Sequence, residues 1–290
     1  MNKAIGFIGL GIMGFPMAGH LSKQHNVFVF NRSKEKTKSW IKKYSGIECS
    51  SIKEISELSD ILILCVGNDN DVREIISEKD GALEYLKPGS SIVDHTTTSA
   101  DLAIEMNNLL SSKNINYLDA PVSGGQAGAE SGQLSIMVGG RDKSYEEIKD
   151  LIKTYSKFSK YMGKSGAGQL TKMVNQICIA GLLQGLAEGI NFSEKVGLNS
   201  SDVLEVVSKG AAQSWQMENR WHTMLEDKFD YGFAVDLMRK DLEIVIKKAQ
   251  DEDITIDVTK IVNDYYKEIQ KAKGGKWDTS SLYKRLKDNL

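Results

Sequence analysis

The chain has 290 residues, of which 41% are hydrophobic and 26% are charged, and its formal net charge is -2 at pH 7. A chain of this length and composition can bury a sizeable core and favours a globular protein of two domains. The near-neutral charge lacks the basic excess that phosphate-backbone binders show, so we expect no nucleic-acid partner.

The spacing of the cysteines and histidines indicates the redox compartment of the protein and whether a metal site is expected. Cys49, Cys65 and Cys178 are widely separated and lack C-x-x-C spacing, as in a reduced intracellular protein. The four histidines have no zinc-ligand spacing, so we expect no metal site. We see no signal-peptide pattern and no apolar run near the roughly 18 residues that span a bilayer. We therefore expect a cytoplasmic protein with no membrane partner.

The first half of the chain alternates short apolar runs with amphipathic stretches. The predicted helices include Ser51–Leu58, which opens with a Ser51-x-x-Glu54 capping box, and Ser99–Leu110. Strands alternating with helices of this length indicate βαβ units, hence an α/β domain with a parallel, doubly wound sheet of the Rossmann type. The predicted strands are Ala4–Ile8, Val27–Phe30, Ile61–Val66, Ser91–Asp94, Tyr117–Asp119 and Leu134–Val138.

The stretch GFIGLGIMG, residues 6–14, has G-x-G-x-x-G spacing between the first strand and a predicted helix. In this context the first glycine allows a tight turn, and the second lets a pyrophosphate approach the backbone. The third lets helix and strand pack closely, and the helix N-terminus faces the phosphates. The motif therefore predicts a dinucleotide-binding loop made of Gly9, Leu10, Gly11, Ile12, Met13 and Gly14.

The end of the second strand indicates which dinucleotide is preferred. NAD-preferring folds usually place Asp or Glu there, whereas this chain has Asn31, Arg32 and Ser33. No acid in this stretch repels a 2′-phosphate, and Arg32 can bind one through a charge-assisted hydrogen bond. We expect NADP(H) to be preferred, with NAD(H) as the alternative. The end of the third predicted strand lies at the same sheet edge and offers further cofactor contacts from Cys65, Val66 and Asn68.

The pattern changes after about Gly163. One long helical stretch without proline runs over Gln169–Val196, and the rest of the chain also has helical periodicity. We expect a dinucleotide-binding domain over residues 1–163 and an all-helical domain over residues 164–290. The second domain begins with the long interdomain helix and serves substrate binding and oligomerisation. Its further predicted helices are Asp202–Ser208, Asp236–Ala249 and Ile256–Ala272.

Several residues are suited to acting on a small anionic substrate. The turn Ser123, Gly124 and Gly125 combines a hydroxyl with accessible backbone N–H groups, which can hold a carboxylate. A lysine can exchange a proton with a carbonyl or hydroxyl oxygen. Farther along the chain, Trp215 offers an aromatic wall and Arg220 a cation that can meet a carboxylate.

Six stretches in order carry a family resemblance: GFIGLGIMG, DHTTT, DAPVSGG, GAGQLTKMVNQ, SWQMENR and FAVDLMRKDL. Together they resemble the β-hydroxyacid dehydrogenase family, which includes 3-hydroxyisobutyrate dehydrogenase, tartronate semialdehyde reductase and the glyoxylate/succinic semialdehyde reductases. The resemblance covers almost the whole chain. It implies that Lys172 is catalytic, that Thr97 contacts the cofactor, and that Lys240 and Asp241 reach the cofactor and the active site.

The amide partner of the lysine stays open. Asn175 and Gln176 lie three and four positions after Lys172, on the same helix face. Either amide can orient the substrate hydroxyl, and many relatives carry Asn where this chain has Gln176. The catalytic candidates are Lys172, Asn175 and Ser123. The substrate-binding candidates are Ser123, Gly124, Gly125, Lys172, Asn175, Gln176, Trp215, Arg220 and Asp241.

The expected activity is NADP(H)-dependent hydride transfer between a small β-hydroxy acid and its semialdehyde, with Lys172 as general acid and base. Family members of this build imply a homodimer or homotetramer. Two alternatives are an imine reductase, which usually lacks the lysine, and a non-catalytic cofactor-binding member. The sequence does not choose among hydroxy acids or between the two reaction directions.

Overall fold

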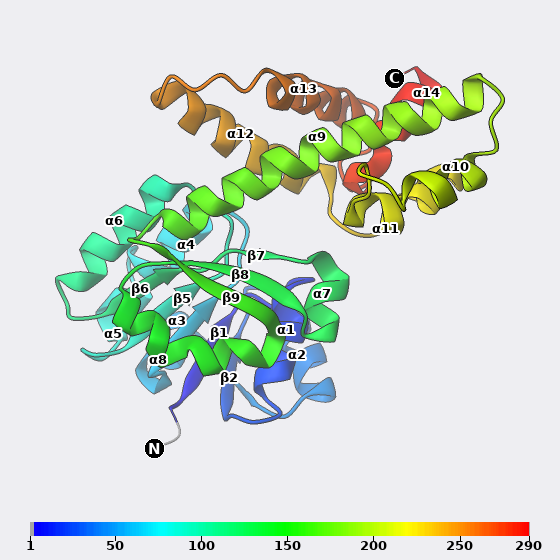
Figure 1. Ribbon diagram of the computed structural model, residues 1–290. Coiled ribbons are helices and arrows are strands. Elements are labelled where there is room, and N and C mark those ends of the chain that lie inside the picture. The colour runs from blue at the N-terminus through cyan, green and yellow to red at the C-terminus, as the bar shows by residue number, and fades with distance from the viewer. Residues whose placement is uncertain (1–2, 290) are drawn as a thin grey trace. The chain divides into compact units, whose positions relative to one another are not determined.

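The computed structural model describes residues 3–289 and divides into two compact units, with the boundary between Lys172 and Met173 (Figure 1). This boundary lies inside the long helix α9, Ala167–Lys195. The sequence-based division at residues 163 and 164 was set just before the start of that helix. Contacts place the first turns of α9 in the Rossmann-type unit, because their residues pack on the sheet of that unit.

The Rossmann-type unit is built on one sheet with strand order β3-β2-β1-β4-β5-β6-β8-β7, and β9 pairs with β8. The first six strands are parallel, and their order reverses between β1 and β4, as in dinucleotide-binding folds. Ile5 of β1 pairs with Val27 on one side and Ile61 on the other. The strands are β1 (Ile5–Ile8), β2 (Val27–Phe30), β3 (Ile47–Glu48), β4 (Ile61–Leu64), β5 (Ser91–Asp94), β6 (Asn116–Asp119), β7 (Val122–Ser123), β8 (Leu134–Gly139) and β9 (Ser156–Gly163).

All six predicted strands are present, but the sheet is mixed rather than wholly parallel. Strand β8 runs antiparallel to β6 and β7, because the chain turns back after Asp119. The two-residue strands β3 and β7 are too short to leave a sequence pattern. Strand β9 was not predicted, because only its first residue is buried and its longest apolar run is two residues.

Helices cover both faces of the sheet (Figure 1), because alternate residues of each buried strand point to opposite sides. Phe7 and Ile63 pack in the core under one set of helices: α1 (Gly14–Leu21), α2 (Lys34–Lys43), α7 (Gly125–Ser131) and α8 (Asp142–Ile152). Ile8 and Leu62 pack under the other set: α3 (Ile52–Leu58), α4 (Asp69–Ile76), α5 (Ala82–Tyr85) and α6 (Ala100–Ser111).

Two predicted helix starts are set by serine caps. Ser51 Oγ accepts from Glu54 N–H at 3.1 Å, and Ser99 Oγ accepts from Leu102 N–H at 3.1 Å. The Glu54 carboxylate binds Ser50 N–H at 2.7 Å instead of returning to Ser51. The cap of α3 therefore spans Ser50 to Glu54, one residue more than the usual capping box. It still provides acceptors for backbone N–H groups at the start of the helix.

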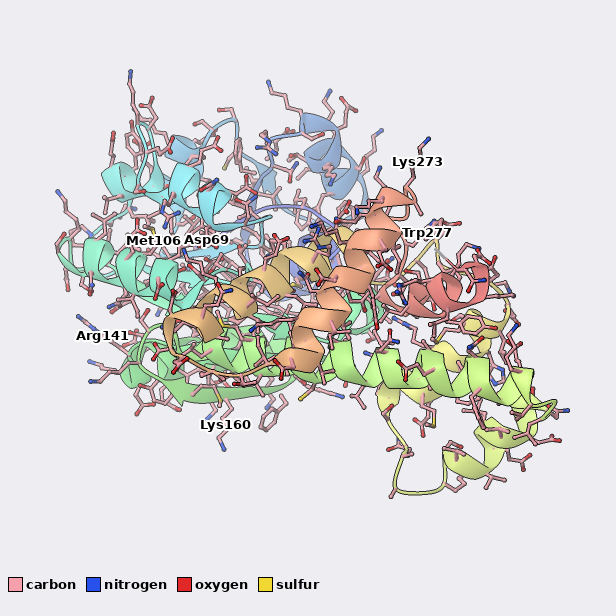
Figure 2. All side chains as sticks on the ribbon, turned by 90° about the horizontal axis from the view of Figure 1, so that it is seen from above. Asp69, Met106, Arg141, Lys160, Lys273 and Trp277 are labelled. Carbon is pink, nitrogen blue, oxygen red and sulfur yellow. The ribbon has the colours of Figure 1, made fainter. Side chains whose placement is uncertain are left out.

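The helical unit packs the rest of α9 against α10 (Ser200–Val207), α11 (Trp215–Leu225), α12 (Val235–Asp251), α13 (Asp257–Lys271) and α14 (Leu282–Asp288). Leu183, Ala187 and Ile190 carry the buried side of α9. Trp277, labelled with Lys273 in Figure 2, packs against this core from the loop after α13. In the described part of the chain α9 alone is long and apolar enough to cross a membrane, a property that core helices of globular domains share.

Candidate active site

The three glycines of the motif have different structural roles. Gly9 has φ of 100°, and a Cβ there would lie 2.2 Å from the Cys65 carbonyl oxygen. A Cβ on Gly14 would lie 1.9 Å from the Gly9 carbonyl oxygen. A Cβ on Gly11 would meet no atom within 4 Å, so the fold itself does not require glycine there. The open space at Gly11 fits a group outside the chain, as a dinucleotide phosphate on this loop would be.

The end of β2 braces the glycine loop. Asn31 Oδ1 accepts from Leu10 N–H at 2.8 Å, and Asn31 Nδ2 donates to the Ser33 carbonyl at 3.1 Å. Arg32 is 85% exposed on its side chain and lies 3.8 Å from Asp71 Oδ1. Asp71 could not be predicted as a neighbour of Arg32, because it comes from α4 and only the fold brings the two side chains together.

The ends of β4 and β5 form the next part of the predicted cofactor edge. Val66 N–H donates to Thr96 Oγ1 at 3.1 Å, and Asn68 Oδ1 caps α4 by accepting from Asn70 N–H at 2.8 Å. Burial raises the pKa of the Cys65 thiol to about 12, so this side chain is a packing group rather than a nucleophile.

Lys172 lies beside the predicted carboxylate turn. Its side chain is almost fully buried, and its Nζ donates to the Val122 carbonyl at 2.9 Å. Ser123 follows directly, and Gly124 and Gly125 have φ of 136° and 60°. A Cβ on Gly125 would meet nothing within 4 Å. The Rossmann-type unit thus brings the Lys172 side chain to a turn with a serine and two glycines of positive φ, of which Gly125 has open space beside it.

The helical unit organises the two amides that follow Lys172 on α9. Gln176 is buried, and its Nε2 donates to Asp241 Oδ2 at 2.6 Å. Its Oε1 accepts from Asn175 Nδ2 at 2.7 Å. Lys240 Nζ lies 3.0 Å from Asp241 Oδ1. Both ends of the Gln176 amide are therefore engaged inside the protein, and Asn175 is the more exposed of the two.

Arg220 occupies a structural position within the helical unit. Its Nε lies 3.1 Å from Asp278 Oδ1, in an ion pair without hydrogen-bond geometry. The guanidinium also lies over the rings of Trp215 and Tyr231, with its carbon 5.2 and 4.9 Å from the ring centroids. Asp278 is fully buried and accepts from Phe233 N–H at 2.9 Å. The predicted specificity cation is thus already neutralised by a carboxylate that sequence spacing did not point to.

A layer of buried titratable groups lies under the strand ends and was also missed. Burial raises the pKa of Asp94 and of Asp119 to about 6 each. Burial lowers the pKa of His95 to about 4. Asp94 accepts from Tyr117 Oη at 2.8 Å, and His95 contacts the Ala120 carbonyl at 2.6 Å. Across residues 3–289 no group of three or more His, Cys, Asp or Glu side chains is arranged to hold a metal ion.

Comparison with known proteins covers both units. Residues 4–173 match the family model described as the NAD-binding domain of 6-phosphogluconate dehydrogenase. Residues 166–286 match the model described as NAD-binding of NADP-dependent 3-hydroxyisobutyrate dehydrogenase. The chain belongs to the β-hydroxyacid dehydrogenase family. It is therefore an NAD(P)-dependent oxidoreductase that acts on CH–OH groups.

Relatives are similar over nearly their full length. An uncharacterized oxidoreductase of Shewanella frigidimarina is 50% identical over 97% of both chains. The 2-hydroxy-3-oxopropionate reductase of Escherichia coli is 30% identical, over 97% of this chain and 96% of its own. The structure of Mycobacterium tuberculosis 3-hydroxyisobutyrate dehydrogenase with L-serine has a TM-score of 0.90 at 26% identity, with 99% of each chain covered.

Proposed function

We propose that the protein interconverts a small β-hydroxy acid and its semialdehyde with NADP(H), and that Lys172 is the general acid and base. The observation that carries this proposal is the buried side chain of Lys172, whose Nζ donates to the Val122 carbonyl at 2.9 Å, next to the Ser123 turn. A lysine in this position supplies a proton to a carbonyl oxygen that becomes a hydroxyl, or removes it in the reverse direction.

The chain's own residues divide the work of the reaction. Bound nicotinamide dinucleotide supplies or accepts the hydride. Ser123 and the backbone N–H groups of Gly124 and Gly125 hold the substrate carboxylate. Lys172 then exchanges one proton with the reacting oxygen, so hydride and proton together convert aldehyde to alcohol.

Asn175, rather than Gln176, is the amide that we propose contacts the substrate oxygen. The Gln176 amide already donates to Asp241 at 2.6 Å and accepts from Asn175 at 2.7 Å. Asn175 Nδ2 carries two hydrogens, and one of them donates to Gln176 Oε1. We therefore propose that Asp241 and Gln176 act as positioning residues, and that Asn175 Nδ2 donates its other hydrogen to the reacting oxygen, whose own proton is exchanged with Lys172.

NADP(H) is the cofactor that we propose is preferred. Arg32 is largely exposed at the end of β2, where a 2′-phosphate is recognised in this fold. Asp71 beside it carries the opposite charge and weakens, without cancelling, the attraction for a phosphate. The match of residues 166–286 to a model named for an NADP-dependent enzyme supports the same preference.

The proposed substrate class is a three- or four-carbon acid with a hydroxyl or aldehyde at the β-carbon. The names of relatives support it, since one acts on 2-hydroxy-3-oxopropionate and one was solved with L-serine. A panel of semialdehydes with NADPH, and of hydroxy acids and L-serine with NADP⁺, tests the proposal by cofactor absorbance. Turnover of at least one carboxylate-bearing member supports it, and no turnover of any member in either direction contradicts it.

A second copy of the chain is the partner that we propose for the outer face of α9. Val174, Leu182, Phe192 and Val196 are exposed apolar residues along this helix, at spacings that keep them near one face. A Cβ on Gly185 within the same face would meet no atom within 4 Å. Such a face allows two helices to approach closely, which supports a dimer or a tetramer built from dimers.

A further inference from the structure

Gln169, in the first turn of α9, pairs with a loop of the predicted cofactor edge. It is fully buried, and its Oε1 accepts from Thr98 N–H at 3.1 Å. Its Nε2 donates to the Thr96 carbonyl at 2.8 Å. The side-chain amide thus binds the backbone on both sides of Thr97, much as a neighbouring strand would.

The same loop is tied on its far side to other strand ends. Thr96 N–H donates to Asp94 Oδ1 at 2.9 Å, and Thr96 Oγ1 accepts from Val66 N–H at 3.1 Å. Ser99, the N-cap of α6, donates through Oγ to Asp69 Oδ2 at 2.6 Å, at the start of α4 (Asp69 is labelled in Figure 2). The loop around Thr97 is therefore held between the ends of β4 and β5 and the side chain of Gln169.

The first turn of α9 is itself fixed to the end of β6. Asp119 Oδ2 accepts from Gln169 N–H at 3.0 Å, and Asp119 Oδ1 accepts from Gly166 N–H at 2.8 Å. A Cβ on Gly168 would lie 2.5 Å from the Asp119 carbonyl oxygen, so only glycine allows this close approach. Gln169 is therefore held at a fixed place relative to the sheet. Through its side-chain amide, the loop around Thr97 is held in place relative to α9.

We infer that Gln169 is a positioning residue that sets the cofactor loop around Thr97 in register with Lys172. Lys172 lies three residues after Gln169, one helical turn along the same side of α9. The inference rests on the proposed function, because it takes Thr97 as a cofactor contact and Lys172 as the proton donor. Without the amide, the loop must be ordered when the cofactor binds, which weakens binding.

The test uses two substitutions at this position and a matched control. Gln169→Met keeps the length of the side chain and removes both hydrogen bonds. In Gln169→Glu a protonated carboxyl has one donor and one acceptor, as the amide has, whereas the ionised form has acceptors only. Burial beside Asp119 raises the pKa of the new carboxyl, so both forms are reached near neutral pH. Gln184→Met alters another buried glutamine of α9, within the helical unit.

The dissociation constant of NADP⁺ is measured by calorimetry for the full chain between pH 5.5 and pH 8. Each value is divided by that of the wild type at the same pH, which cancels titration of the cofactor itself. We expect Gln169→Met to bind about tenfold more weakly at every pH, the effect of about one net hydrogen bond. We expect Gln169→Glu to bind within about threefold of wild type at pH 5.5 and about tenfold more weakly at pH 8.

Gln184→Met should bind as wild type does throughout. A structural role alone would lower the thermal unfolding midpoint of the Gln169 variants and leave the affinity ratio of Gln169→Glu independent of pH, which would overturn the inference. Equal affinity of Gln169→Met and wild type would also overturn it. Wild-type protein that binds neither NADP(H) nor NAD(H) would contradict the proposed function first, and this inference with it.

Discussion

Gln176 Nε2 donates to Asp241 Oδ2 at 2.6 Å, which joins α9 to α12 within the helical unit. Asp241 is buried, and its other carboxylate oxygen, Oδ1, lies 3.0 Å from Lys240 Nζ. The bond fixes which end of the Gln176 amide is oxygen, and that oxygen in turn orients Asn175. This arrangement supports the proposal that Asn175, rather than Gln176, contacts the substrate.

Asn175→Ala should therefore lower kcat/KM on the best substrate more than any change to its supporting residues. We expect a loss of about ten- to a hundredfold for Asn175→Ala, the effect of one hydrogen bond to the reacting oxygen. Asp241→Asn keeps an acceptor for Gln176 and should lose less than about tenfold. Steady-state kinetics of Asn175→Ala, Gln176→Met and Asp241→Asn test this order, in which we expect Gln176→Met to lose less kcat/KM than Asn175→Ala and more than Asp241→Asn. A larger loss in Gln176→Met than in Asn175→Ala contradicts it.

Lys172→Ala should remove the proton transfer and leave the cofactor site intact. General acid–base catalysis contributes about a hundred- to ten-thousandfold, so we expect kcat to fall by that factor. The affinity for NADP⁺ should stay within about twofold of that of the wild type, because the proposed partner of Lys172 is the substrate oxygen and not the cofactor. Ser123→Ala is the comparison variant, and it should mainly raise KM. Wild-type kcat in Lys172→Ala would refute the mechanism.

Much of the fold could be predicted because buried parallel strands leave apolar runs. The segments that form β1, β2, β4, β5 and β8 are short, contain buried apolar residues and are separated by polar segments, and each forms a strand at its predicted place. Strand β9 left no such signal, because only its first residue is buried and it pairs only with β8 among the described strands. A pattern of apolar residues indicates burial, so it does not predict a strand that lies at a sheet edge and is largely polar.

The site was predicted less completely, because contacts between distant segments are not encoded in local spacing. The G-x-G-x-x-G loop was identifiable because its parts are contiguous. Asp278 lies 58 positions after Arg220 (278 − 220), and only the packing of α11 against that segment places them 3.1 Å apart. Asp71 beside Arg32 and Gln169 beside Thr98 were missed for the same reason. Chemically suitable residues could be named, but not the partners that occupy or orient them.

The cofactor preference should respond in opposite directions to the two members of the Arg32–Asp71 pair. Arg32→Ala should lower kcat/KM for NADPH by about ten- to a hundredfold, with little change for NADH, since a charge-assisted bond to the 2′-phosphate is lost. Asp71→Asn should raise kcat/KM for NADPH by a few fold, because a negative charge near the phosphate is removed. Kinetics with both cofactors measure the ratio. An unchanged NADPH-to-NADH ratio in Arg32→Ala would show that the arginine does not read the phosphate.

Charge on the outer face of α9 should separate the proposed subunits. Gly185→Glu adds a carboxylate to that face, where the chain itself leaves space for a side chain, so the fold should be kept. We expect the wild type to scatter light as a dimer or larger and Gly185→Glu to shift towards the 32.1 kDa monomer at micromolar concentration. Gln250→Glu adds the same charge on an exposed position of α12 and should not dissociate the assembly. A monomeric wild type would end the proposal.

The buried neighbours Asp94 and His95 should affect stability with opposite dependence on pH. Asp94 has a pKa raised from 3.8 to about 6 by burial, so the folded state holds its proton more tightly than the unfolded state. Its stabilising contribution is therefore greatest at low pH and falls as the pH rises from about 4 to 6. His95 has a pKa lowered from 6.5 to about 4, so its contribution is lost as the pH falls over that same range.

Urea unfolding of wild type, Asp94→Asn and His95→Gln, followed by circular dichroism from pH 4.5 to 7, tests these signs. Glutamine can still donate to the Ala120 carbonyl and accept from the Tyr155 hydroxyl, as His95 does in its Nδ1–H form. The stability of wild type relative to Asp94→Asn should decrease with rising pH, and relative to His95→Gln it should increase. Each change should be about 2 kcal/mol between pH 4.5 and 7, since each pKa departs by roughly two from its ordinary value and this range covers most of each titration. Two variants with the same pH dependence would show that burial does not set these protonation states.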